Sequence, residues 1–255
     1  MAKADLNSDL GESFGRYTLG MDEQVLPLIS SANVACGFHA ADPVVMANTV
    51  ALARRYGAAV GAHPGYPDLM GFGRRNMAVS PEEARAYILY QLGALDAFLR
   101  PLGIKMQHVK PHGAMYNMAA KDPALARAIC AGNRDFDGSL IVLGLSGSQF
   151  GPAAEEMGLR WVSEVFADRA YEEDGSLVAR SKPGSMITDE DEAVSRVVRM
   201  VKEGKVTAIT GKDISLKADS ICVHGDGPKA VAFTGKIRAA LEAEGVEICP
   251  IAQLV

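Results

Sequence analysis

Residues 31–43 read SANVACGFHAADP and contain the unit from which we predict the fold. Ser31–Cys36 is an almost unbroken run of small and apolar residues, which is typical of a parallel strand covered on both faces. Asp42 and Pro43 then mark a helix start, with the aspartate as N-cap and the proline at the first helical position. His39 falls between the two. The stretch therefore predicts a strand, a loop with a polar side chain, and a helix.

The same unit recurs along the whole chain. Further strand-like runs, the last of them weaker, are Ala4–Asn7, Ala58–Ala62, Lys105–Val109, Leu140–Leu145, Arg160–Val165, Ser220–Val223 and Val246–Ile251. Because strands that alternate with helices form parallel sheets with right-handed crossovers, and no linker interrupts them, we predict an α/β fold. It is a single domain over residues 1–255, a distorted (β/α) barrel of seven parallel strands, or eight if the last run joins.

The intervening helices carry start signals. Ser80-Pro81-Glu82-Glu83 predicts an N-cap with a capping box, and an apolar stripe from Ala84 to Leu99 follows it. Thr188-Asp189-Glu190-Asp191 opens another helix, and Gly227-Pro228 a further one. Two long connections, His63 to Ser80 and Ala167 to Ile187, follow strands directly. We expect both at the C-terminal end of the barrel, as binding loops.

Composition excludes several classes of protein. The 255 residues include 26 Lys or Arg and 31 Asp or Glu, a net charge of −5, and 48% are hydrophobic. This balance excludes a disordered chain and disfavours nucleic-acid binding, which needs a basic excess. The longest apolar runs, such as Leu140–Leu143, are too short to span a bilayer. No apolar signal core follows Lys3, and the four cysteines are scattered, so we expect a cytoplasmic protein with reduced thiols.

Polar residues stand at the ends of most predicted strands, where a (β/α) barrel builds its active site. Imidazoles and carboxylates on one rim suit metal binding or proton transfer. In chain order the candidates are Asn7, Asp9, Glu12, His39, His63, Lys110, His112, Glu164, Asp168, Arg169, His224 and Asp226.

Other residues have plainer interpretations. His108 lies inside a predicted strand, and we expect it to fill the core or lumen. For Glu164, a structural ion pair and a catalytic role both remain open. Arg74 and Arg75 are expected at a solvated loop tip. The chain has no P-loop, no GxSxG elbow and no GxGxxG fingerprint, which disfavours P-loop ATPases, serine hydrolases and Rossmann dehydrogenases.

The residues alone leave the chemistry of the rim open. Asp9 with His39 and His63 would suit a divalent metal, which takes imidazole and carboxylate ligands together. The same groups without a metal would suit general acid–base hydrolysis. The spacing of the residues in the sequence does not choose between the two.

The motif set resembles the LamB/YcsF family, the A subunits of 5-oxoprolinase. Three small departures are Ser8, Ala41 and Met115, of which only Ala41 would matter, if its turn requires a positive φ. The matching stretches cover nearly the full chain in the family's order: Asp5–Glu12, Ala35–Asp42, Gly61–Asp68, Val109–Asn117, Glu164–Tyr171 and Val223–Asp226.

The resemblance implies ATP-dependent hydrolytic opening of 5-oxo-L-proline (pyroglutamate) to L-glutamate, in a complex with 5-oxoprolinase subunits B and C. It also implies the barrel of polysaccharide deacetylases. A lactam is a stable amide, so its hydrolysis benefits from activation, for example by phosphorylation of the carbonyl oxygen. Since the chain carries no nucleotide-binding motif, we expect the partner subunits to handle most of the ATP chemistry, and this chain to open the activated ring.

The expected roles follow from the position at strand ends. Asp9, His39 and His63 hold or deprotonate the attacking water, with or without a metal. Lys110 and His112 stabilise negative charge on the substrate. Arg169 binds the substrate carboxylate, and His224 with Asp226 manages a proton. We expect Asn7, Glu12, Glu164 and Asp168 beside the substrate.

Two other interpretations remain. The chain could be a stand-alone metal-dependent deacetylase of an N-acetyl sugar, or a noncatalytic subunit that delivers pyroglutamate.

Overall fold

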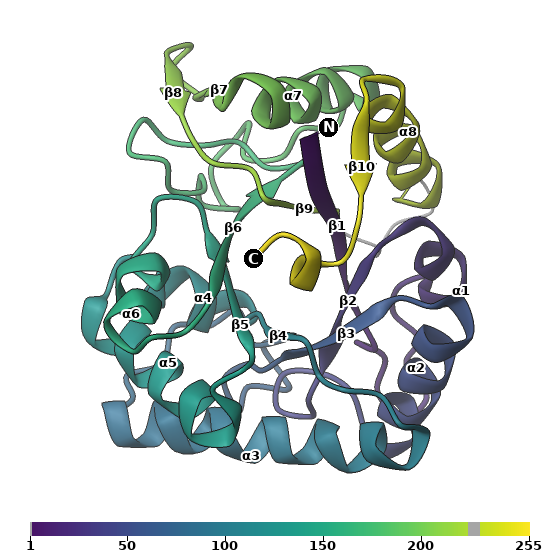
Figure 1. Cartoon of the computed structure of the whole chain (residues 1–255). Coiled ribbons are helices and arrows are strands. Elements are labelled where there is room, and N and C mark those ends of the chain that lie inside the picture. The colour runs from purple at the N-terminus through teal and green to yellow at the C-terminus, as the bar shows by residue number, and fades with distance from the viewer. Residues whose placement is uncertain (1, 224–229) are drawn as a thin grey trace.

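Seven parallel strands close into a ring in the computed structural model, which describes residues 2–223 and 230–255 (Figure 1). Going around the ring, each strand pairs with the next, and the last one pairs back with β1. The predicted barrel is thus confirmed. The strands are β1 (Ala2–Leu10), β2 (Ser31–Ala35), β3 (Ala59–His63), β4 (His108–Val109), β5 (Ile141–Leu145), β6 (Trp161–Phe166) and β9 (Ser220–Cys222).

The eighth predicted strand forms but does not enter the ring. β10 (Val246–Ile248) pairs in parallel with the first residues of β1, Ala2 to Ala4, whereas β9 pairs with the next ones, Asp5 to Asn7. The run predicted to continue to Ile251 ends at Ile248, and a 3-10 turn (Ile251–Gln253) follows it. Ile251 packs against Ile141, Leu143 and Val162, so this turn closes the N-terminal end of the barrel.

Two strands were not predicted, and one strand of the ring is much shorter than predicted. β7 (Lys205–Thr207) and β8 (Asp213–Ser215) form a separate antiparallel hairpin that projects beyond the barrel in Figure 1. The predicted strand Lys105–Val109 is reduced to its last two residues.

Helices cover the outside of the ring. The capping box predicted at Ser80 is present, and the whole predicted stripe of the following helix is buried. Asp42 caps its helix as expected, and the cap of the later helix is Asp189, whose side chain accepts from Glu192 N. Gly227-Pro228 lies outside the described residues. The helices are α1 (Asp22–Val25), α2 (Pro43–Tyr56), α3 (Pro81–Leu99), α4 (Gly113–Ala119), α5 (Pro123–Asp137), α6 (Phe150–Glu156), α7 (Glu190–Glu203) and α8 (Ala230–Ala243), with 3-10 turns at Leu26–Leu28 and Arg100–Leu102.

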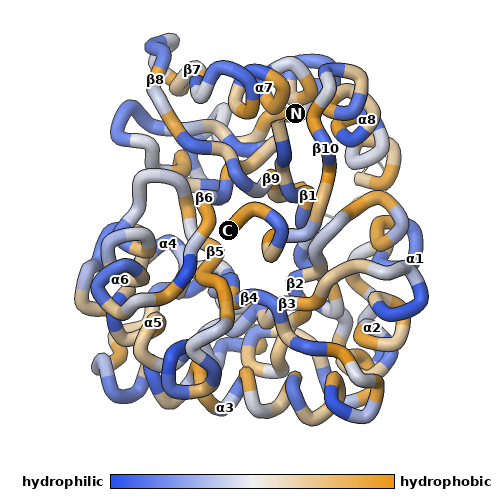
Figure 2. Tube along the Cα trace, in the orientation of Figure 1, coloured by the Kyte–Doolittle hydropathy of each residue, from blue (hydrophilic) through white to orange (hydrophobic). Residues whose placement is uncertain are grey.

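Apolar side chains fill the layer between strands and helices, and Figure 2 shows hydrophobic segments along β5 with mixed polarity on the outer helices. None of the described helices combines the length and the apolar character needed to cross a bilayer.

The lumen of the barrel is polar rather than apolar over much of its height. Asn33 Nδ2 donates to Asn7 Oδ1 (2.7 Å), and His108 Nε2 lies 2.7 Å from Asn33 Oδ1. His108 is fully buried, as predicted, and burial lowers its pKa to about 3, which keeps the imidazole neutral. Gly61 makes room for it, because a Cβ there would lie 2.2 Å from His108 Nε2. This ladder of hydrogen bonds supports the strand ends above it.

Candidate active site at the C-terminal mouth

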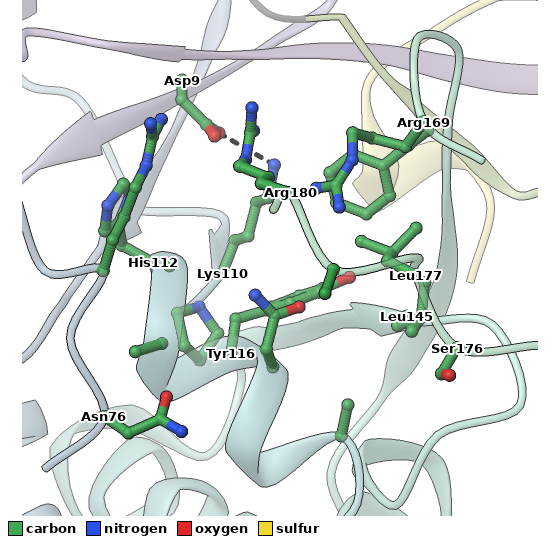
Figure 3. Close-up of a pocket in the computed structure, with 18 of the residues that line it drawn as sticks. Asp9, Asn76, Lys110, His112, Tyr116, Leu145, Arg169, Ser176, Leu177 and Arg180 are labelled. Atoms are coloured by element: carbon green, nitrogen blue, oxygen red, sulfur yellow. Dashed lines mark hydrogen bonds and ion pairs between the residues drawn. The ribbon is translucent and has the colours of Figure 1, made fainter. Parts of the chain in front are cut away.

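Side chains from β1, β2, β3, β4 and β6, or from the loops after them, meet at the C-terminal mouth of the barrel. A pocket of about 510 Å³ opens there and is lined, among others, by Asp9, His63, Lys110 and Arg169 (Figure 3). Both long loops contribute to it, through Arg74 from the first and Arg180 from the second. The expected convergence is therefore found among the described residues, while His224 and Asp226 lie outside them.

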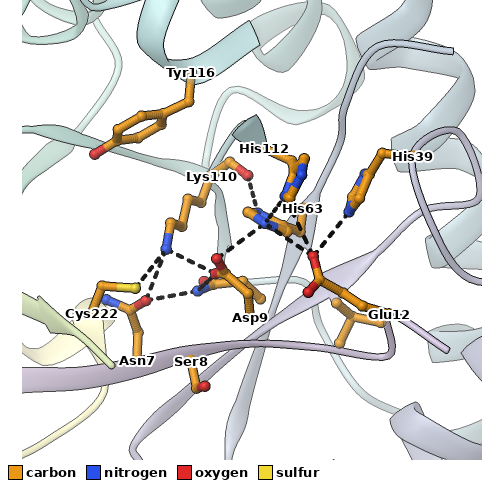
Figure 4. Close-up of polar contacts among 12 residues, drawn as sticks. Asn7, Ser8, Asp9, Glu12, His39, His63, Lys110, His112, Tyr116 and Cys222 are labelled. Atoms are coloured by element: carbon orange, nitrogen blue, oxygen red, sulfur yellow. Dashed lines mark hydrogen bonds and ion pairs between the residues drawn. The ribbon is translucent and has the colours of Figure 1, made fainter. Parts of the chain in front are cut away.

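Lys110 holds two carboxylates together at the floor of the mouth. Its Nζ lies 2.8 Å from Asp9 Oδ1 and 3.2 Å from Cys222 Sγ (Figure 4). The same Nζ lies 2.8 Å from Glu164 Oε1. Burial acts to lower the pKa of Lys110, but the charge of Asp9 and the other acidic neighbours offsets this and holds the pKa well above its usual range. Lys110 is therefore a charged ammonium that pairs with both Asp9 and Glu164. Of the two roles left open for Glu164 by the sequence, the ion pair is thus present.

Tyr116 joins this network, although the sequence analysis did not select it. Its hydroxyl donates to Glu164 Oε2 at 2.6 Å, and burial raises its pKa well above the usual value. It is therefore a protonated donor that lines the pocket. The only signal in the sequence was its place within Val109–Asn117, on the first turns of the helix after β4.

Backbone carbonyls fix the tautomers of two histidines beside Asp9. His63 Nδ1 lies 2.7 Å from the carbonyl oxygen of Lys110, and His112 Nε2 lies 2.8 Å from that of Phe72. Because a carbonyl only accepts, each of these nitrogens carries the hydrogen. The opposite nitrogens, His63 Nε2 and His112 Nδ1, then present lone pairs to each other at 3.0 Å. Two acceptors at this distance need a proton or a cation between them.

Glu12 and His39 complete the group. Glu12 Oε1 lies 3.2 Å from His39 Nε2 and 3.4 Å from His112 Nδ1, and the rings of His39 and His112 stack at 3.7 Å. Burial lowers the pKa of His39 and of His112 well below 6.5, so both are neutral.

These four residues fit a divalent metal ion. One ligand atom from each of Glu12, His39, His63 and His112 lies within 4.8 Å of the others. Neutral imidazoles with one carboxylate are the donors that Zn²⁺ and similar ions prefer, and backbone carbonyls orient two of the imidazoles from behind. The set differs from the predicted Asp9, His39 and His63: Glu12 supplies the carboxylate and His112 a third imidazole. Asp9 Oδ2 lies next to the group, 3.3 Å from His63 Nε2.

Of the remaining candidates, one lines the pocket and two lie outside its lining. Arg169 lines the pocket, while its guanidinium donates to the carbonyls of Val178 (2.6 Å) and Ser185 (3.4 Å). Asn7 is buried below the mouth, bonded to Ser220 and Asn33, and Asp168 is half-buried beside Arg169 and outside the pocket lining. Arg74, expected at a solvated loop tip, is exposed but lines the pocket, and Arg75 pairs with Asp68.

Ala41 is the one departure from the family's motifs that was expected to matter. Its φ is +71°, in the left-handed region that favours glycine. The turn after β2 therefore does require a positive φ, and this chain meets the requirement with an alanine.

The chain is similar to known proteins over nearly its whole length. The sequence profile of the LamB/YcsF family matches residues 4–255. The 5-oxoprolinase A subunit from Clostridium beijerinckii is 65% identical over 251 residues, 98% of each chain. The crystal structure of a lactam utilization protein from Thermus thermophilus superposes with a TM-score of 0.91 at 50% identity, over 97% of this chain and 99% of that one.

A more distant likeness concerns the fold alone. The T48 deacetylase covers 99% of this chain and 90% of its own at a TM-score of 0.53, with 13% identity. The barrel is thus of the deacetylase-like type that was predicted. On the full-length match and the high identities, the chain belongs to the LamB/YcsF family.

Proposed function

We propose that this protein is the A subunit of a multi-subunit 5-oxoprolinase and opens the ring of 5-oxo-L-proline to give L-glutamate. The names of its relatives, the A subunit of 5-oxoprolinase and lactam utilization protein, support this reaction class. The observation that carries it is the position of Asp9, which faces the pocket between the Lys110 ammonium and His63 Nε2, 2.8 Å and 3.3 Å away.

Ring opening joins a water oxygen to the carbonyl carbon of the lactam and breaks the bond from that carbon to nitrogen. Asp9 is the proposed general base, which takes a proton from the water. Lys110 keeps the Asp9 carboxylate in place and adds positive potential near the carbonyl oxygen, where negative charge develops. The nitrogen leaves as an amine and takes up a proton, a role we assign to His224 with Asp226.

Glu12, His39, His63 and His112 would hold a divalent metal at the same mouth. Such an ion, when bound, lowers the pKa of a water molecule and polarises a carbonyl. Arg169, on another part of the pocket wall, is the proposed partner of the substrate carboxylate.

The proposal includes ATP and two partner subunits, B and C. A lactam amide is stable, so the reaction benefits from a substrate that is activated first. The sequence has no P-loop or dinucleotide fingerprint, which favours ATP handling by the partners. Four free, buried cysteines favour a reducing compartment such as the cytoplasm.

The test is glutamate formation from 5-oxo-L-proline and ATP in a reconstituted three-subunit mixture. We expect turnover with this chain present, none with it omitted, and a loss of at least a hundredfold for His63→Ala. His63→Ala and Asp9→Asn variants that both turn over near the wild-type rate would contradict the assignment, as would unchanged turnover without the chain.

The histidine cluster also supports a second candidate, a metal-dependent N-deacetylase of a small carbohydrate. This activity would require neither ATP nor partner subunits. Metal content of the protein purified without added metal, together with release of acetate from an N-acetyl sugar by the chain alone, distinguishes the two candidates.

A further inference from the structure

Gln91 is a fully buried glutamine in the apolar stripe of α3, a helix that contacts β3. Its neighbours Ile88 and Leu92 are apolar and buried, yet its amide is fully engaged. Gln91 Oε1 accepts from Gly65 N at 2.9 Å, and Nε2 donates to the carbonyl oxygens of Gly65 and Tyr87, each at 2.9 Å. A buried amide that makes two hydrogen bonds to one backbone residue fixes the position of that residue.

Gly65 lies just beyond the last contact between the chain after β3 and the chain after β4. That contact is at Pro64, whose carbonyl oxygen accepts from His112 N at 2.8 Å. One residue further on, the backbone N–H and carbonyl oxygen of Gly65 bond only to Gln91 among the described residues. The side chain of Gln91 therefore takes the place of a neighbouring strand near the start of the long loop after β3.

Gly65 in turn packs against His39, one of the four side chains proposed to hold a metal ion. A Cβ on Gly65 would lie 2.7 Å from His39 Nδ1, so this close approach requires a glycine. His39 Nδ1 is buried and has no hydrogen-bond partner in the described part of the chain, whereas the second ring nitrogens of His63 and His112 donate to backbone carbonyls. A metal-binding histidine is ordinarily oriented by such a hydrogen bond. His39 depends instead on packing, against Gly65 and against the stacked ring of His112 (Figure 4).

We infer that Gln91 is a positioning residue for the metal site: it holds Gly65 against His39 and thereby directs His39 Nε2 to the same ion as the other three ligands. If Gly65 is released, the Nδ1 edge of His39 loses a contact that no hydrogen bond replaces. A less ordered ligand binds an ion less tightly. This inference rests on the metal site of the proposed function and adds a residue of the outer helix layer to it.

The probe is Zn²⁺ alone, added to the full-length metal-free protein, with its Kd measured by competition with a chromophoric chelator. Gln91→Met keeps the length of the side chain and removes its hydrogen bonds, and we expect it to weaken Zn²⁺ binding about tenfold or more. Gly65→Ala leaves the α3 stripe intact but puts a methyl group against the His39 ring, and it should weaken binding in the same way.

The matched control is Leu95→Ala, one helical turn beyond Gln91 in the same buried stripe. It opens a cavity in the helix layer, so its melting temperature should fall at least as far as that of Gln91→Met. Its Kd for Zn²⁺ should stay within about threefold of the wild-type value, because it leaves the Gln91 amide in place.

A second comparison repeats Gln91→Met in a His39→Ala background. Because Gln91 acts through His39, the substitution should then change the Kd for Zn²⁺ by less than about threefold. A loss of the same size in both backgrounds would overturn the inference. Wild-type affinity in Gln91→Met or in Gly65→Ala would also overturn it, as would an equal loss in Leu95→Ala.

The titration needs no turnover, so its outcome is independent of ring opening. Zn²⁺ binding that depends on Gln91, in a protein that fails to open the ring, would remove the proposed function and leave the role of Gln91. A wild-type protein that opens the ring but binds no Zn²⁺ would remove the role of Gln91 and leave the function.

Discussion

Strand β1 carries two carboxylates with different surroundings, Asp5 fully buried in the lower lumen and Asp9 partly buried at the mouth. Asp5 accepts hydrogen bonds from the hydroxyls of Ser30 (2.7 Å), Ser31 (2.6 Å) and Ser220, with no cation within 4.0 Å among the described residues. Asp9, four residues further on, meets the Lys110 ammonium and the His63 imidazole instead. Neutral hydroxyls hold a carboxylate in place, whereas an ammonium and an imidazole give it charged and titratable partners. The difference fits a structural role for Asp5 and the proposed general-base role for Asp9.

Asparagine at either position tests this division most directly. We expect Asp9→Asn to lower the kcat of glutamate formation in the reconstituted complex about a thousandfold, because an amide cannot take the proton from water. This corresponds to an increase of about 4 kcal/mol in the activation free energy. The matched control, Asp5→Asn on the same strand and the same face, should retain kcat within about threefold. Equal losses in the two variants would contradict the division.

The Lys110 ion pairs should matter for stability as well. Lys110→Met leaves Asp9 and Glu164 without their cation in a buried setting, and we expect the free energy of unfolding to fall by about 3 kcal/mol. Urea denaturation followed by circular dichroism measures it. Lys212→Met removes an exposed lysine that pairs with Glu173, and its cost should stay below about 1 kcal/mol. Similar costs for the two changes would show that the buried network adds nothing.

Asp5 should make stability depend on pH in the opposite sense to an ion-paired carboxylate. Burial raises its pKa from 3.8 to about 6, although the three serines act to lower it. The folded state therefore holds the proton more tightly than the unfolded state. The stabilisation is fully present below pH 3.8 and is lost as the pH rises through 6.

The change integrates to about 2 kcal/mol between pH 4.5 and 7.5. The difference in unfolding free energy between wild type and Asp5→Asn should shift by this amount, with wild type relatively more stable at pH 4.5. Urea titrations of both proteins at the two pH values measure the shift. A constant difference would mean that Asp5 keeps an ordinary pKa.

The smallest expected effect concerns Tyr116. Tyr116→Phe removes the 2.6 Å hydrogen bond to Glu164 and should cost about 1 kcal/mol of unfolding free energy. Tyr90→Phe, on an exposed side chain, is the control and should cost almost nothing. Indistinguishable variants would show that Glu164 relies on Lys110 alone.

The barrel could be predicted because most of its strands are nearly continuous runs of small and apolar residues that alternate with helices, and capping side chains mark the starts of α2, α3 and α7. The β7–β8 hairpin offered no such signal. Lys205–Thr207 and Asp213–Ser215 contain one apolar residue each, and they form strands because they pair with each other. The short β4 shows the converse, since Lys105–Val109 has strand-like composition but only its last two residues pair.

The residue types of the candidate site could be predicted, but their grouping could not. Asp9 lies near the end of β1 and Glu12 just beyond it, and Gly11 between them has a φ of +71°. The turn at Gly11 directs Glu12 to the three histidines, while Asp9 contacts Lys110 and His63. The spacing of the residues in the sequence does not determine this difference. Arg180 escaped prediction because the course of its loop depends on backbone hydrogen bonds between distant residues, such as Ile187 N to Asp168 O.

The closure of the ring by β9 has a consequence for biosynthesis. β1 is made before the other strands, yet its neighbour on one side comes from residues 220–222 and 246–248. Until these later residues are made, the backbone amides along one edge of β1 have no neighbouring strand to pair with, and the barrel around Asp9 is incomplete. The mouth around Asp9 is thus completed only after residues 220–222 have been made, and a polypeptide that stops before them would expose the unpaired edge of β1 instead of a closed barrel.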